Sequence, residues 1–98
     1  MDCEHVLELV CGAIYSAAKK IYLVLVSDKI AGYIRAYEQE LDAYGPVLDA
    51  LKEFDRVLGC GAINRAYEDA AREVCRYYRE HNIDHNESFC RKFLTGDA

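Results

Sequence analysis

Two cysteines and two histidines near the C-terminal end have the residue types of a structural zinc site. They are Cys75, His81, His85 and Cys90. Thiolates and imidazoles are preferred zinc donors, and four of them would close a tetrahedral site. The spacing contains no CxxC pair, so the alternative is that the histidines lie in polar positions and the cysteines pack in the core. A zinc-stapled regulatory helical domain is therefore an alternative function, while the primary expectation is no metal and no cofactor.

Cys60 is the candidate for a reactive thiol. It lies between Gly59 and Gly61, immediately before a predicted helix. A thiolate at a helix N-terminus is stabilised by unpaired backbone N–H groups, which lowers the pKa of the thiol. No histidine adjoins Cys60 in the sequence to act as a base, so the alternative is an unreactive cysteine in a tight turn.

The number of cysteines bears on the cellular setting. Five is an odd number, and a secreted disulfide framework would leave one cysteine unpaired. The first residues are acidic (Asp2, Glu4, Glu8) rather than basic, which is not typical of a signal peptide. We therefore expect free thiols and a cytoplasmic protein.

Acidic side chains gather in the middle of the chain. The net charge is -5, and residues 38–55 hold six acids against one lysine. This balance argues against direct nucleic-acid binding, which depends on attraction to phosphates. It favours a protein partner with a basic surface. The predicted partner-binding residues are Tyr37, Glu38, Asp42, Tyr44, Asp49 and Glu53.

No serine–histidine or carboxylate pair has the spacing of catalytic machinery, so we expect no enzyme. The favoured function is a non-catalytic interaction module, an adaptor or an inhibitor. A further alternative uses the same acids as a nucleic-acid-charge mimic that blocks a nucleic-acid-binding protein. The identity of the partner stays open.

The element that must organise these residues is an apolar stretch at residues 6–26. Apolar side chains recur there at helical spacing, and residues 21–26 are apolar on all sides. Such a helix end must be covered by the rest of the chain or by a second copy, so a homodimer is possible. A strand at residues 21–26 is the minor alternative. Lys19 and Lys20 interrupt the stretch, so no membrane span is expected.

Further helices follow from periodicity and turn residues. Ser27-Asp28 is either a boundary or an interior point of one long helix. Gly45-Pro46 predicts a stop between helices at residues 30–44 and 47–58. A helix at residues 62–81 precedes a short last helix that ends near Leu94, with Asp84 and Glu87 as its capping box. We predict a single all-α domain over residues 1–98, a four-helix bundle with a short fifth C-terminal helix.

Overall fold

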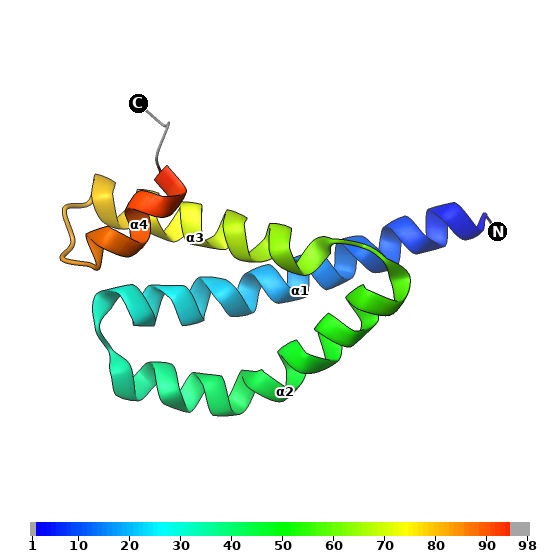
Figure 1. The fold of residues 1–98 in the computed structure, drawn as a ribbon, viewed down its shortest axis with the longest axis horizontal. Coiled ribbons are helices and arrows are strands. Elements are labelled where there is room, and N and C mark those ends of the chain that lie inside the picture. Colours follow the sequence, from blue (N-terminus) through cyan, green and yellow to red (C-terminus); the bar gives the residue numbers. More distant parts are fainter. Residues whose placement is uncertain (1, 95–98) are drawn as a thin grey trace.

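Helices form almost all of residues 2–94, the part of the chain that the structure, a computed structural model, describes (Figure 1). In chain order they are α1 (Cys3–Ala31), α2 (Ile34–Leu58), α3 (Ala62–Glu80) and α4 (Glu87–Leu94). The described residues contain no strand, so the all-α prediction is confirmed and the alternative strand at residues 21–26 is wrong. The predicted domain of residues 1–98 extends beyond the described residues at both ends.

Helix α1 is a single rod of 29 residues. Asp2 caps its N-terminus, and Oδ1 of this residue accepts a hydrogen bond from the backbone N–H of Glu4 at 3.0 Å. The helix passes through Ser27-Asp28 without a break and ends at Gly32, which has a φ of +82°. Glycine adopts this left-handed conformation at no steric cost, so the helix ends there rather than at Ser27.

The predicted stop at Gly45-Pro46 is wrong, because α2 continues through Pro46. Proline lacks the N–H that would bond to the carbonyl of residue 42, and its ring pushes on that carbonyl. A helix interrupted in this way bends, and Figure 1 shows α2 bending near its middle. Packing on both sides of the proline, through Tyr37 and Leu48, keeps the two halves helical. Residues 2–94 therefore form three long helices and a short fourth one.

The three long helices lie side by side rather than around a common axis. In Figure 1, α1 lies between α3 and α2. The Cα positions span 49 × 34 × 17 Å, so the molecule is flat. Helix α1 packs extensively against both neighbours, whereas α2 and α3 touch each other little. The three long helices form a layer, and α4 packs against α1 and α3 at one end of it.

In this layer the apolar end of α1, residues 21–26, is covered on some sides and exposed on another. Ile21, Leu25 and Val26 are buried, as expected from their position toward the neighbouring helices. Val24 is 39% exposed, because no helix covers that side of α1 among the described residues. Of the two alternatives for this segment, full coverage by its own chain therefore does not hold at Val24, and coverage by a second copy stays a prediction.

Small side chains bring α1 and α3 together. Ala62, Ala66, Ala70 and Ala71 of α3 have no exposed surface, and neither does Ala18 of α1. Side chains of this size allow the two helix backbones to approach closely while larger residues interlock beside them. The core has two clusters along α1, one shared with α2 and α3, the other with α3 and α4.

Two disulfide bonds connect the helices. Cys11 is bonded to Cys60, and Cys75 is bonded to Cys90, while Cys3 is free and exposed. The prediction of free thiols is therefore wrong for four of the five cysteines. The first bond fixes α1 to the α2–α3 turn, and the second holds α4 against α3. The pairing depends on the antiparallel arrangement of the helices, which cysteine spacing does not encode.

Helix α1 is long and apolar enough to cross a bilayer by length and composition, with 28% of its most apolar window buried in the structure. Core helices of water-soluble proteins and signal sequences have the same properties. The expected absence of a membrane span stays a prediction.

Candidate interaction site

The four residues of the alternative zinc site lie in the same region, but a disulfide, a ring stack and an ion pair engage them instead of a metal. Cys75 and Cys90 form a fully buried disulfide and have no thiolate to offer a metal. His81 stacks on Tyr77 with ring centroids 4.1 Å apart, and Nε2 of His85 lies 2.5 Å from Glu87. The described residues contain no group of His, Cys, Asp and Glu that could hold a metal ion. The zinc alternative is therefore wrong in its chemistry, because a disulfide rather than a metal joins α4 to α3.

Cys60 is likewise not a reactive thiol, because its sulfur is bonded to Cys11. The turn that contains it is built by Gly59 and Gly61, which both have positive φ angles. Asp55 closes the turn, and its Oδ1 accepts a hydrogen bond at 2.8 Å from the backbone N–H of Ala62, the first residue of α3.

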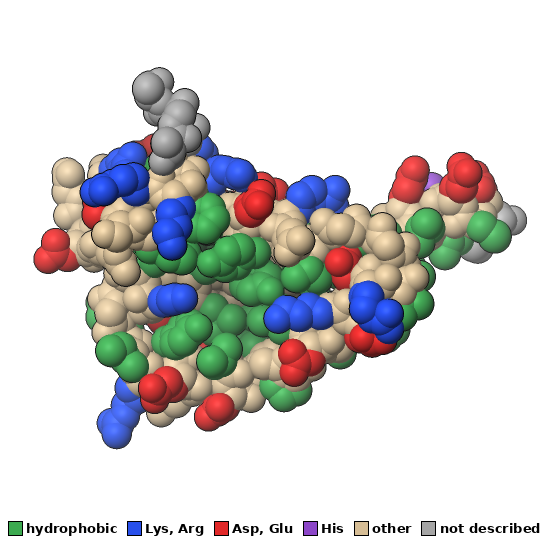
Figure 2. Space-filling view, viewed as in Figure 1, with side chains coloured by type: hydrophobic (Ala, Val, Ile, Leu, Met, Phe, Trp, Pro, Cys, Tyr) green, Lys and Arg blue, Asp and Glu red, His purple; other side chains and the backbone are tan. Residues whose placement is uncertain are grey.

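Four acidic residues of α2 form an exposed ridge. They are Glu38, Asp42, Asp49 and Glu53. Their separations of four, seven and four residues place them on one face of the helix. Acidic side chains follow α2 along the lower edge of the molecule in Figure 2. We call these four residues the acidic ridge.

Only one member of the acidic ridge has a basic partner among the described residues. Arg56 donates hydrogen bonds to both carboxylate oxygens of Glu53, which lowers the pKa of that carboxyl group. Glu38, Asp42 and Asp49 have no ion pair within the described chain. The ridge is therefore a row of carboxylates whose charge is mostly not neutralised by its own molecule.

The other two acids of the predicted cluster have structural roles. Asp55 caps α3, as described above. Glu40 turns toward α1 and is paired with Asp28, and one of its carboxylate oxygens is buried without a hydrogen-bond partner. A hydrogen bond with Asp28, partial burial and the negative charge of Asp28 together raise the pKa of Glu40 from 4.5 to about 6. The two carboxyl groups can bond to each other only when they share a proton.

The shared proton predicts a pH effect on stability. Since the pKa of Glu40 is raised in the folded state, its stabilising contribution is complete below pH 4.5 and is lost as the pH rises through about 6. A Glu40→Gln variant keeps a donor for Asp28 at every pH. We expect it to be more stable than the wild type at pH 7, with the difference shrinking toward pH 4.5. Thermal denaturation between these values measures this, and parallel pH profiles would contradict it.

The two tyrosines of the predicted site do not lie among the acids. Tyr37 packs against the core cluster between α1 and α2, and Tyr44 follows two turns later on the same face of α2. Tyr44 is exposed, whereas Tyr37 is partly buried. The structure therefore brings the four carboxylates together and separates both tyrosines from them.

A groove between α1 and α2 was not predicted. It encloses about 150 Å³. Its lining residues are Tyr22, Leu25, Val26, Lys29, Tyr37, Leu41, Leu48, Lys52 and Tyr67. Figure 2 shows an apolar hollow in the middle of the molecule with basic side chains beside it. The sequence did not indicate this groove, because it depends on the pairing of α1 with a bent α2. We call it the α1–α2 groove.

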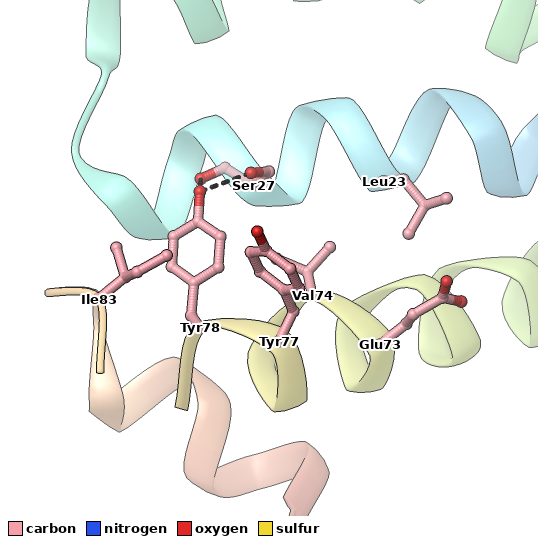
Figure 3. A pocket seen from close by; sticks show the side chains of 7 residues that line it. All are labelled: Leu23, Ser27, Glu73, Val74, Tyr77, Tyr78 and Ile83. Carbon is pink, nitrogen blue, oxygen red and sulfur yellow. Dashed lines mark hydrogen bonds between the residues drawn. The ribbon is translucent and has the colours of Figure 1, made fainter. Parts of the chain in front are cut away.

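A second hollow of about 330 Å³ lies between α1 and α3 (Figure 3). Three of its polar side chains are already engaged: the hydroxyl groups of Tyr78 and Ser27 are hydrogen-bonded at 2.7 Å, and Glu73 pairs with Lys19 at 2.9 Å. The rest of its lining is mainly aliphatic and aromatic, including Leu23 and Val74.

Comparison with other proteins does not add to this description. No known protein family, no curated protein and no solved structure matches the sequence.

Proposed function

We propose that this protein is a non-catalytic interaction module, an adaptor or inhibitor that presents the acidic ridge of α2 to a basic surface on a protein partner. One observation carries the proposal: Glu38, Asp42 and Asp49 lie exposed on one face of one helix without a basic partner among the described residues. Neighbouring like charges repel one another, and opposing positive charge would relieve that repulsion.

A ridge of this kind acts mainly on the encounter between the two proteins. Complementary charges increase the association rate and fix the orientation of the partner, and salt weakens both effects. Because the ridge lies on a preformed helix, binding costs little backbone conformational entropy. The proposal assigns no catalysis to the chain.

Charge reversal of the ridge tests the proposal. A variant carrying Glu38→Lys, Asp42→Lys and Asp49→Lys is expected to lose at least about tenfold in affinity for the captured partner, because attraction becomes repulsion. Capture from the native host with mass spectrometry identifies the partner, and titration at two salt concentrations measures the affinity.

The matched control reverses three other exposed acids, Glu68, Glu80 and Asp84, and so reaches the same net charge. We expect it to bind its partner nearly as well as the wild type does. If both triple variants lose affinity equally, net charge rather than the ridge is responsible. Competition by DNA or RNA for the captured partner would favour the charge-mimic version of the proposal.

The cellular setting of this function is part of the proposal. The cytoplasmic prediction rested on the odd number of cysteines and the acidic N-terminal residues, and it came with an expectation of free thiols that the two disulfides overturn. Disulfides persist mainly in oxidising compartments, so the structure favours such a setting. Trapping free thiols in the native host before lysis tests it: one free thiol per chain supports an oxidising setting, and five support the cytoplasm.

A further inference from the structure

The first eight residues of α1 project from the molecule as an uncovered helix. In residues 3–10 every side chain is exposed, and Leu9 reaches 62%. Figure 2 shows this segment extending past the other helices, with both apolar and acidic side chains on its surface. Its apolar residues are Val6, Leu7, Leu9 and Val10, and its acids are Glu4 and Glu8. We call residues 3–10 the arm.

The arm cannot bury its apolar side chains against its own molecule. It continues directly into the rest of α1, which is helical to Ala31, so it cannot fold back. The disulfide between Cys11 and Cys60 fixes the base of the arm to the α2–α3 turn. Four large apolar side chains therefore remain in water on a helix of about two turns, unless another molecule covers them.

The α1–α2 groove is also apolar, but its charged side chains have the opposite sign to those of the arm. Its two charged lining residues, Lys29 and Lys52, are both basic, in a chain whose net charge is -5. The remaining lining side chains are aliphatic or are tyrosines, of which Tyr22 and Tyr67 have a raised pKa because they are partly buried. The groove thus offers an apolar floor with basic rims, and no carboxylate lines it.

We propose that the arm of one copy of this chain docks in the α1–α2 groove of a second copy, and that the exchange is reciprocal. The apolar side chains of the arm would cover the floor of the groove, while Glu4 and Glu8, one turn apart on the same side of the arm, would extend toward one of the two basic rims. Amphipathic helices bind apolar grooves in this way, through side chains at helical spacing. The proposal is independent of the acidic ridge, which lies on the outer face of α2.

The dimensions agree with this docking. The arm is about 12 Å long, at 1.5 Å per helical residue. On the α1 side, the groove extends over the eight residues from Tyr22 to Lys29, about 12 Å by the same measure. A reciprocal exchange uses the same two surfaces on both copies, so it closes as a two-fold dimer and does not continue into a filament.

Sedimentation velocity of single and mixed variants tests the proposal. An arm variant, Leu7→Glu with Val10→Glu, and a groove variant, Leu41→Glu, are each expected to weaken wild-type dimerisation at least about tenfold. The control is Val57→Glu, an equally drastic change at an exposed residue of α2 outside the groove. It should leave the dimer intact, and circular dichroism should show native helicity for all variants.

Mixing the arm variant with the groove variant tests the proposal more specifically than either variant alone. The arm variant keeps an intact groove, and the groove variant keeps an intact arm, so an equimolar mixture regains one of the two contacts. We expect a heterodimer that is weaker than the wild-type dimer and stronger than either variant alone. A charge exchange provides a second test. The Glu4→Lys, Glu8→Lys variant and the Lys29→Glu, Lys52→Glu variant should each dimerise more weakly than the wild type. Mixing the two variants should restore association.

Three results would overturn the proposal. The first is a wild-type protein that stays monomeric up to about 100 μM, a concentration well above typical dissociation constants of specific dimers. The second is a dimer that survives the arm variant. The third is a monomer whose arm binds vesicles of phosphatidylcholine, which would make the arm a membrane anchor instead.

Discussion

Replacing Cys11 and Cys60 with serine is expected to lower the free energy of unfolding by about 4 kcal/mol. The bond joins residues that are 49 positions apart, so its removal lets the unfolded chain explore many more conformations. The same argument gives about 3 kcal/mol for the bond between Cys75 and Cys90, which spans 15 positions. Since small domains are stable by about 5–15 kcal/mol, losing both bonds would leave little of the fold.

Urea denaturation of the oxidised protein and the double-serine variant measures this effect. Cys3→Ser is the control, because Cys3 is exposed and has no disulfide partner. It should leave the denaturation midpoint unchanged. Equal midpoints for the wild type and the Cys11→Ser, Cys60→Ser variant would show that this bond does not form or does not constrain the chain.

The second large effect is expected at the centre of the layer. Leu25→Ala should cost about 2–5 kcal/mol, because its side chain is 5% exposed and its removal leaves a cavity between α1 and α2. The adjacent residue supplies the control. Val24 is 39% exposed, and Val24→Ala removes little buried surface while favouring the helix.

The comparison of these neighbours tests the layer arrangement directly. In a closed bundle that surrounds α1, both substitutions would be costly. In the open layer, only Leu25→Ala is costly, and Val24→Ala should change stability by less than about 1 kcal/mol. A similar loss for both in a protein shown to be monomeric would contradict the open layer.

The sequence predicted local features of the fold better than their combination. The stripe at residues 6–26 identified α1, and the glycines at residues 59 and 61 marked the turn before α3. The cap of the last helix was misplaced, because Asn86 rather than Asp84 accepts the hydrogen bond from the backbone N–H of Phe89, at 3.2 Å. Both residue types cap helices well, so only the path of the chain decides between them.

The two larger errors have one physical origin. Gly45-Pro46 is a strong local stop signal, and tertiary packing of Tyr37 and Leu48 on α1 outweighed it. The cysteines were expected to be free because spacing alone does not show which helices are antiparallel neighbours. Contacts between residues far apart in the sequence decided both the continuity of α2 and the disulfide pairing. Such contacts cannot be derived from local patterns in a single sequence.

The two candidate sites also differ in whether local sequence patterns could predict them. The four carboxylates of the acidic ridge lie on one helix, so helical spacing was sufficient to place them together. The α1–α2 groove draws on three helices, and its basic rims come from residues 23 positions apart. Sites of that kind become visible only when the fold is known.

The unequal burial of the two disulfides has a consequence for redox conditions. Cys75 and Cys90 have no exposed surface, whereas Cys11 and Cys60 are partly exposed. Thiol–disulfide exchange requires access to sulfur, so a mild reductant would open the bridges stepwise and attack Cys11–Cys60 first. The half-reduced intermediate would keep α4 tethered while the first turns of α1 come loose from the α2–α3 turn.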